Sequence, residues 1–465
     1  MLDAAIVAAH VVTVLTVGMV GARRNRGVTL KDFALGRGEH QSWLLIGTFG
    51  AAALDASATL GQAEWSFRVG ITATFICCVG FPVADLLLAA IVAPRVRCFA
   101  GCISCGDILA RCYGASGRVI GGVAVVLACL VTVGVQISAL GFVGETLLGV
   151  PASRASLMGL LLVTLYSALG GMVAVALTDV VQLATVSVAV CLLAGACWIH
   201  SGGWHGLAAT LPTTHMELFP TRASLFELLP LLFLFCLPLL GPSKVHRLLL
   251  ADSGNQAARC LQVSALLRGL LTALVGFVGL TAFAMDPALG AGRALPAAVD
   301  TLLPVGARGV VIAGLVAAMM STCDSFLHTG AIALIHDVLA PVWRSFQLSF
   351  PRKRESTVET AWLPWTRGAV VGLALVSVLL VHDGGSVIQL VLRRLDLWLP
   401  GIALPLLLGF LGVRGSGRGF VAAVVAGYGT CAAWNLWLTP VVGLGGLLPA
   451  IVVNGVVLLA WPGRR

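Results

Sequence analysis

The sequence predicts an all-α polytopic membrane protein. Hydrophobic residues make up 58% of the 465 residues and charged residues only 11%. Apolar runs of about 17–25 residues, long enough to cross a bilayer as helices, recur from one end of the chain to the other. No stretch of comparable length is polar, so residues 1–465 are expected to form a single membrane domain.

Hydropathy divides the chain into about 13 spans. The opening span, 3–22, precedes Arg23 and Arg24 instead of following a basic segment. This is the wrong order for a cleaved signal peptide, so a retained helix is predicted. The expected spans are 3–22, 43–66, 69–93, 119–148, 155–170, 173–200, 224–241, 260–284, 308–338, 368–381, 386–411, 419–437 and 441–461.

The basic residues indicate the orientation of the chain. If the N-terminus lies outside, most of the 29 Lys and Arg residues fall in cytoplasmic loops, as the positive-inside rule requires. We therefore expect a multi-pass protein of a bacterial inner membrane with its C-terminus in the cytoplasm. The net charge of +9 favours contact with anionic membrane lipid and not with nucleic acid, because the basic residues lie in short loops.

The stretch 48–65, TFGAAALDASATLGQAEW, carries the strongest functional signal. Asp55 lies in the middle of an apolar span, among small residues that make a break in the helix inexpensive. An ionisable group at this depth costs at least about 2.5 kcal/mol and usually faces protein or a water-filled cavity. A discontinuous helix whose freed carbonyls bind a cation is one interpretation. An aspartate that pairs with a neighbouring helix for packing alone is the other.

Three motifs resemble a known family. Residues 166–182, YSALGGMVAVALTDVVQ, carry Tyr, Gly-Gly, Thr-Asp and Gln in the order of the sodium:solute symporter signature. Residues 315–326, LVAAMMSTCDSF, are similar to the sodium-site helix of that family, and 241–259 to the cytoplasmic loop after its second broken helix. An acid followed two residues later by Ser57 is similar to the proline and pantothenate-type bacterial branch. The resemblance covers about residues 1–460.

The resemblance implies an inverted repeat of two five-helix bundles, each opening with a broken helix. An extra helix, 3–22, would precede the first half, 43–200. Two more, within 419–461, would follow the second half, 224–411. The sequence adds one sign of this symmetry, because 43–66 is rich in Gly and Ala and 224–241 contains Pro230 and Pro238.

The resemblance also implies a site for Na⁺, a hard cation that prefers oxygen ligands. The implied ligands are the carbonyls of Ala53, Ala56 and Ala318 and the hydroxyls of Ser321 and Thr322. Three acids would give the sodium path its negative potential: Asp55, Asp179 and Asp324. The alternative for the two hydroxyls is a hydrogen bond to a carbonyl one turn earlier in their own helix.

The sequence gives weaker evidence for the substrate site than for the sodium site. Candidates by position are Ser57, Gln62, Phe233, His328 and Trp398. Inside span 386–411, Arg393 and Asp396 are three residues apart and can pair on one face of a helix, which leaves Arg394 without a local acid. Structural pairing with a carboxylate on another helix and recognition of an anionic solute are both open for it.

We therefore expect sodium-coupled secondary symport of a small organic solute, an amino acid or an organic acid, by alternating access. A membrane sensor module of a signalling system with the same fold is the alternative. The sequence lacks catalytic patterns such as H-E-x-x-H and G-x-S-x-G, so no enzyme is expected. The basic segment 344–366 departs from the family pattern and is interpreted either as an inserted cytoplasmic loop or as an ordinary basic loop.

Overall fold

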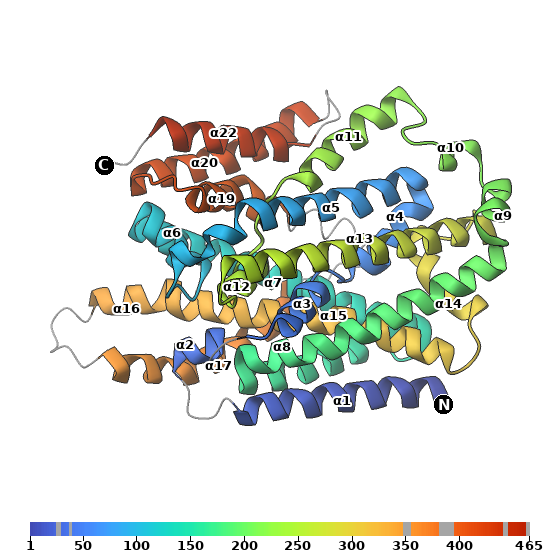
Figure 1. The fold of residues 1–465 in the computed structure, drawn as a ribbon, viewed down its shortest axis with the longest axis horizontal. Coiled ribbons are helices and arrows are strands. Elements are labelled where there is room, and N and C mark those ends of the chain that lie inside the picture. Colours follow the sequence, from blue (N-terminus) through green and yellow to red (C-terminus); the bar gives the residue numbers. More distant parts are fainter. Residues whose placement is uncertain (25–28, 37–39, 347–354, 381–394, 440–444, 462–465) are drawn as a thin grey trace.

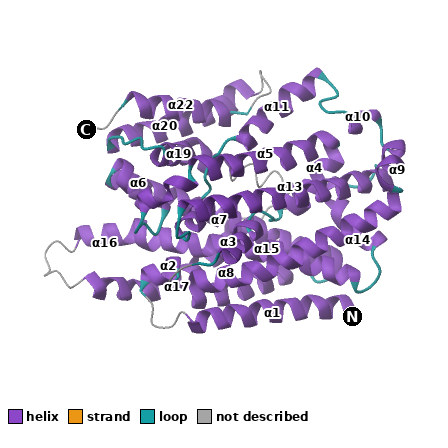
Figure 2. Ribbon diagram, viewed as in Figure 1, coloured by secondary structure: helices purple, strands orange, loops and turns teal. Residues whose placement is uncertain are grey.

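The computed structural model describes residues 1–24, 29–36, 40–346, 355–380, 395–439 and 445–461, and these form helices and loops without strands (Figure 2). The predicted all-α class is confirmed. Among these residues, 8 helices are long and apolar enough to cross a membrane, and four apolar helices are shorter. Helices satisfy every backbone hydrogen bond internally, as the bilayer requires. The count of about 13 spans stays a prediction.

The first half of the predicted repeat follows the outer helix α1 (Leu2–Arg24) and the short α2 (Leu30–Leu35). Its first helix is broken: α3 (Ser42–Ala51) ends before residues 52–56, and a π-helical turn (Ser57–Gly61) then leads into α4 (Gln62–Val69). The other elements are α5 (Ile71–Ile91), a 3₁₀ turn (Ala93–Phe99), α6 (Cys105–Tyr113), α7 (Ala115–Leu148) and α8 (Ala152–Ser201).

The bend inside α8 joins two predicted spans. Spans 155–170 and 173–200 form one helical stretch that is interrupted at Gly171, where φ is 60° and ψ is −160°. Glycine adopts this left-handed backbone at little cost, so the bend lies where the two predicted spans meet, at the pair Gly170-Gly171.

The second half also opens with a broken helix: α11 (Arg222–Cys236), residues 237–241, and α12 (Pro242–Leu249). It follows α9 (Gly203–Thr210) and α10 (Thr213–Met216). The remaining elements are α13 (Gly254–Met285), a 3₁₀ turn (Ala291–Arg293), α14 (Ala294–Leu302), α15 (Ala307–Ile332), a π turn (Ala333–Leu339), α16 (Ala340–Phe346), α17 (Glu355–Leu380), a π turn (Leu399–Ala403) and α19 (Leu404–Phe410). The last elements are α20 (Gly417–Ala433), a π turn (Trp434–Leu438) and α22 (Leu447–Ala460).

Two sequence predictions need correction here. Residues 242–249 are not part of a cytoplasmic loop, because they form the buried helix α12 after the second break. The segment 344–366 is not a loop throughout either: α16 ends at Phe346 and α17 begins at Glu355. Residues 347–354 lie outside the described part of the chain, and whether the segment is an insertion stays a prediction.

The core is built around α15. This helix packs against α8, α7 and α1, while α13 packs against α5, α4 and α3 (Figure 1). Small residues permit these close approaches. A Cβ added at Gly314 would meet the Cβ of Ala189 at 2.2 Å, and one at Gly279 would meet the Ala63 carbonyl oxygen at 2.3 Å. The broken helix α3–α4 is thereby held between α13 and the centre of the bundle.

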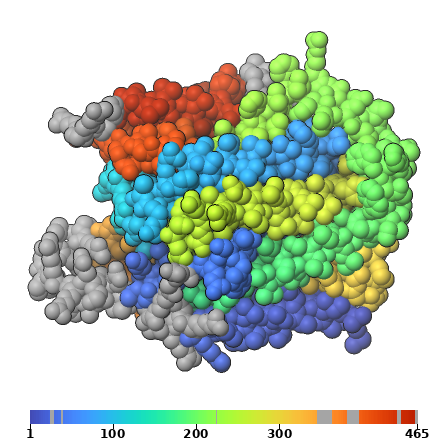
Figure 3. Space-filling model, viewed as in Figure 1, coloured from blue at the N-terminus to red at the C-terminus, as the bar shows by residue number. Residues whose placement is uncertain are grey.

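Two outer helices, α1 and α22, flank the bundle on opposite sides. In Figure 3, α1 and α22 run along opposite edges of the visible face. The N-terminus and the end of α22 also lie at opposite ends of the bundle (Figure 1).

Candidate functional site

A pocket of about 240 Å³ opens beside the first break. Its wall includes Asp55 and Ser57 from the break, Gln62 from α4, and Trp398. Aromatic side chains of α5 and α11, Phe81 and Phe235, line it as well, stacked with their ring centroids 4.3 Å apart. The pocket therefore joins both broken helices, and three of the predicted substrate residues, Ser57, Gln62 and Trp398, line it.

Asp55 organises the first break. Its Oδ1 accepts hydrogen bonds from the backbone N–H groups of Ser57 (2.9 Å) and Ala58 (3.0 Å), and from the Ser57 hydroxyl. These bonds cap the start of the next helical segment, as an acid at a helix N-terminus does. Asp55 is thus both a capping residue and a negative charge on the pocket wall.

Gln136 of α7 supports the same break and was missed by the sequence analysis. Its Oε1 accepts from the Ala56 N–H at 3.0 Å, and its Nε2 donates to Asp55 Oδ2 at 3.4 Å. The side chain is fully buried, so these bonds replace those that water would make. Nothing near Gln136 in the sequence marks it, because its partners are about 80 residues away.

The predicted sodium ligands lie in two elements, the first break and α15. Ser321 of α15 donates to the Ala318 carbonyl at 3.0 Å, and its Oγ also lies 3.4 Å from the carbonyl oxygen of Ala51, at the end of α3. Thr322 donates to the same Ala318 carbonyl at 3.4 Å. Both hydroxyls therefore make the hydrogen bond to a carbonyl one turn earlier, which was the alternative to sodium binding. The Ser321 hydroxyl also contacts Ala51, the last residue before the break.

The carbonyls of the break differ in their hydrogen bonds. The Ala56 carbonyl accepts from the Gly61 N–H at 2.9 Å, in the π-helical turn. The described residues place no hydrogen-bond donor on the carbonyl of Ala53, which lines the pocket. A carbonyl oxygen has two lone pairs, so both groups keep a position for a further ligand.

Beyond the break lies a buried network centred on Arg247 of α12. Its guanidinium is only 2% exposed and contacts Asp179 Oδ2 at 3.3 Å. It also donates to Thr48 Oγ1 at 2.9 Å and to Ser325 Oγ at 2.6 Å. Thr48 in turn donates to Asp179. Helices α3, α8, α12 and α15 are thereby joined through one side chain that the sequence analysis placed in a loop.

The second acid of this network is Asp324. It accepts hydrogen bonds from the Tyr166 hydroxyl at 2.7 Å and from Ser325 Oγ at 3.1 Å. Both Asp179 and Asp324 are fully buried, and Asp179 Oδ1 has no hydrogen-bond partner in the described part of the chain. Asp179 thus contacts the Arg247 guanidinium directly, and Asp324 is linked to it through the Ser325 hydroxyl, on the route predicted for sodium.

The second break carries different chemistry. The indole N–H of Trp398 donates to the Leu240 carbonyl at 2.7 Å, so an oxygen freed by this break is used within the protein. Lys244 follows at the start of α12 and donates to Asp85 of α5, which also lies 3.4 Å from Arg268 of α13. These three charged residues line the pocket, and none was a sequence-based candidate.

The other predicted substrate residues are placed as follows. Gln62 lines the pocket and donates to Ser66 Oγ at 2.8 Å. Phe233 is 61% exposed and is not part of the pocket wall, whereas its neighbour Phe235 is. His328 is buried away from the pocket, with its ring centroid 5.0 Å from that of Phe33. Arg394 lies outside the described residues.

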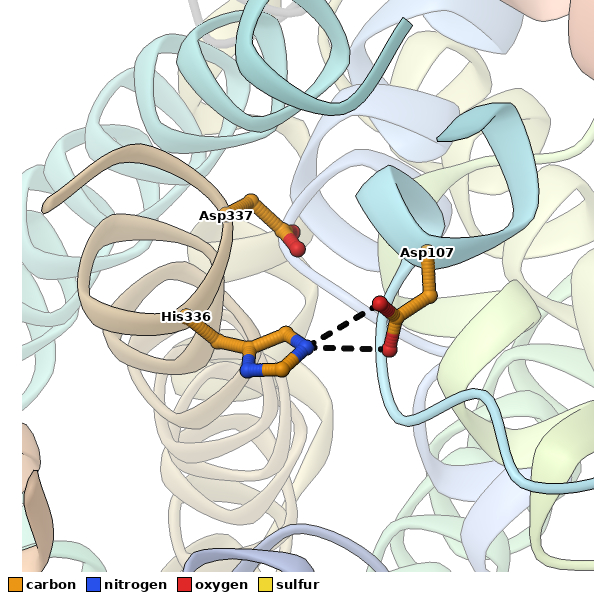
Figure 4. A group of neighbouring side chains, drawn as sticks. All are labelled: Asp107, His336 and Asp337. Atoms are coloured by element: carbon orange, nitrogen blue, oxygen red, sulfur yellow. Dashed lines mark hydrogen bonds and ion pairs between the residues drawn. The ribbon is translucent and has the colours of Figure 1, made fainter. Parts of the chain in front are cut away.

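A group of potential metal ligands lies at the α6 end of the bundle (Figure 4). His336 Nε2 is 3.0 and 3.1 Å from the two oxygens of Asp107, and Asp337 lies beside them. Burial opposes ionisation of Asp107, but the hydrogen bond with His336 lowers the pKa of its carboxyl below the usual value. Arg118 already pairs with Asp107 at 2.7 Å. We interpret the group as a set of contacts that holds together α6, α7 and the π turn that follows α15.

Comparison with known proteins agrees with this geometry. The sequence matches the profile of the sodium:solute symporter family over residues 33–427. It is 24% identical to sodium/proline symporters of Staphylococcus aureus strains, over 97% of this chain and 90% of theirs.

Two solved structures share the fold. A substrate-bound, outward-open Na⁺-coupled sialic acid symporter superposes with a TM-score of 0.79 at 18% identity, covering 100% of this chain and 99% of that one. A nucleobase-cation-symport-1 family transporter, closed on bromovinylhydantoin, has a TM-score of 0.56 at 13% identity, covering 91% of this chain and 94% of that one.

The family profile covers most of the chain, and both solved structures are of transporters. The multi-pass membrane character predicted from the sequence agrees with the apolar helices of the structure. The chain therefore belongs to the sodium:solute symporter family, and it is a sodium-coupled symporter of a small solute and not an enzyme.

Proposed function

We propose that this protein couples the entry of Na⁺ to the uptake of an amino acid or an organic acid across a bacterial inner membrane, with the N-terminus outside and the C-terminus in the cytoplasm. The observation that carries the proposal is the contact between the first break and α15. Ser321 Oγ lies 3.4 Å from the Ala51 carbonyl, directly before residues whose backbone leaves the helical pattern.

In the proposed sodium site, carbonyls and hydroxyls replace the water around the ion. Residues 52–56 would supply the carbonyls of Ala53 and Ala56, and α15 the carbonyl of Ala318 with the hydroxyls of Ser321 and Thr322. Hard cations accept this ligand set. The ligands are neutral, so the ion is held weakly enough to leave, and Asp55 provides the nearby negative charge that attracts it.

The two elements have to move apart for transport. Ligands from the break and from α15 belong to different helices, so a relative movement of these helices opens or closes the site. Sodium that leaves toward Asp324 and Asp179 meets the guanidinium of Arg247 between them. Movement of α12 would displace that guanidinium and change the potential along the path.

In this proposal the solute binds in the adjoining pocket. Its volume of about 240 Å³ suits a small molecule, and its wall combines stacked aromatic rings with charged side chains. Ser57 and Gln62 stand on the side of the first break, and Trp398 on the side of the second. Sodium at the break would fix the backbone that carries Ser57, which couples the two ligands.

The test is uptake into proteoliposomes. An inward sodium gradient should drive accumulation of at least one labelled compound from a set of amino acids and organic acids, and an equal potassium gradient should not. Replacement of both Ser321 and Thr322 by Ala should weaken the sodium dependence, with Thr329→Ala as the matched control. Thr329 also donates to its own helix, at 2.8 Å to Ser325, but lies two turns further on. Uptake that is indifferent to sodium would refute the proposal.

A further inference from the structure

Two cations share one carboxylate in the wall of the solute pocket. Lys244 donates to Asp85 Oδ1, and Arg268 Nη1 lies 3.4 Å from Asp85 Oδ2. The Asp85 side chain is 5% exposed, Lys244 is 26% and Arg268 is 15% exposed. The cluster therefore has one excess positive charge that is neither fully buried nor open to bulk water.

The nearest other charges do not neutralise this excess. Arg247 also lines the pocket, but it already forms an ion pair with Asp179. Asp55 lines the pocket at the first break, where Ser57, Ala58 and Gln136 donate to it. Lys244 and Arg268 are thus left with Asp85 alone among the acids that they contact in the described structure.

Arg268 is held in a geometry that suits an anion. Its guanidinium carbon stands 4.1 Å from the centroid of the Phe81 ring, which fixes the plane of the group by a cation–π contact. Its buried Nε has no hydrogen-bond partner among the described residues. A planar guanidinium with an unused N–H is pre-organised for a carboxylate, which it binds through two parallel hydrogen bonds.

The start of α12 adds a third source of positive potential. Gly241, Pro242 and Ser243 line the same pocket, and no side chain caps this end of the helix. The first N–H groups of a helix lack helical acceptors and attract anions. In transporters with broken helices, such half-helix N-termini commonly point at the anionic group of the solute.

The depth of the cluster makes an excess charge costly. Arg268 is 14 residues after the first residue of α13, or about 21 Å along the helix. Intramembrane charges usually pair with one another or mark a substrate pathway. An anion that enters the pocket would supply the missing negative charge.

We propose that the pocket recognises its solute through a carboxylate held between Lys244 and Arg268, while the apolar part of the solute lies against Phe81 and Phe235. This inference rests on the proposed transport function and deepens it by assigning the two side chains that bind the carboxylate of the solute. Asp85 positions the two cations and keeps the empty pocket from carrying two unpaired charges.

The test compares carboxylates with amides of the same shape. Purified protein in a sodium buffer is titrated with acetate, propanoate, lactate and benzoate, and with acetamide, propanamide, lactamide and benzamide, and its melting temperature is recorded. At least one acid should stabilise the protein where its amide does not, because ligand that binds only folded protein raises the melting temperature. Lys244→Met and Arg268→Gln should each weaken that acid's affinity about ten- to hundredfold.

The matched control is Arg259→Gln, which removes an exposed charge from the same helix outside the pocket and should leave the affinity unchanged. Asp85→Asn provides a test in the opposite direction if either neutral variant fails to fold. It releases both cations and should tighten carboxylate binding about tenfold.

Equal stabilisation by acids and amides, or by neither, would overturn the assignment, and so would an equal loss in Arg259→Gln. Stabilisation by choline chloride that matches that of the acids would assign the site to chloride and overturn it too. Failure of the transport proposal looks different. In that case the preference for acids survives, but sodium gradients drive no uptake of the preferred acid.

Discussion

The two broken helices share an architecture and differ in chemistry. At the first break, residues 52–56 combine an acid with a pocket-facing carbonyl that receives no donor from the described residues. At the second break, residues 237–241, the Leu240 carbonyl accepts a hydrogen bond from the Trp398 indole N–H. Lys244 lies in the first turn of the helix that follows, α12. The first break therefore offers oxygens and negative charge, and the second offers N–H groups and positive charge.

This difference teaches how one pocket can hold two ligands of opposite charge. In the proposed arrangement, sodium binds beside the first break and an anionic group of the solute binds beside the second. Each ligand reduces the electrostatic cost of the other, since opposite charges attract more strongly where water is scarce. Coupling between ion and solute then follows from their shared position between two helices that move.

The largest effect is expected where the two regions meet, at Arg247. This residue follows the second break and reaches Thr48, which precedes the first. Arg247→Met would leave Asp179 buried without its cation, and breaking a buried ion pair costs about 3–5 kcal/mol. Chemical denaturation of the purified variant should show this loss. The double variant Arg247→Met, Asp179→Asn should recover part of it, and a single variant as stable as the parent would contradict the role of the pair.

Variants of Asp55 separate the effect of charge at the first break from the effect of its backbone geometry. Asp55→Asn keeps an oxygen that can accept from the N–H groups of Ser57 and Ala58 but removes the charge. Sodium affinity should fall roughly tenfold, because a nearby charge contributes on the order of 1 kcal/mol or more at low dielectric. Asp55→Glu keeps the charge and should retain more affinity. If sodium activates uptake equally in both variants and the parent, Asp55 serves packing alone.

A smaller effect is expected for the carbonyl at the second break. Trp398→Phe removes the indole N–H from Leu240 and keeps most of the apolar surface. An unsatisfied buried acceptor costs about 1–3 kcal/mol, and water entering the pocket would reduce this toward the lower value. Melting should therefore shift by a few degrees, with sodium activation unchanged. A loss of sodium activation would show that the two breaks do not have separate roles.

The sequence predicted the first region better than the second. An acid amid small residues, Asp55, identified the break because an isolated charge in an apolar span needs an explanation of its own. The predicted spans 155–170 and 173–200 likewise meet at the bend in α8, because Gly171 permits a left-handed backbone there.

The second region was missed because its residues are polar. The string PSKVHRLL has the composition of a surface loop, so α12 and its burial were not expected. The burial of Lys244 and Arg247 depends on Asp85 and Asp179, which lie 159 and 68 residues away. Such pairings between distant segments leave no local pattern in a single sequence. Phe233 was chosen in place of Phe235 for a related reason, since only the rotation of α11 distinguishes them.

The most direct measurement is the effect of sodium on the melting temperature of purified protein without solute. Sodium should stabilise the parent more than an equal concentration of potassium, because an ion that binds only the folded state raises its stability. The double variant Ser321→Ala, Thr322→Ala should lose this difference, while Thr329→Ala should keep it. A sodium-specific shift that persists unchanged in the double variant would contradict the placement of the ion between the first break and α15.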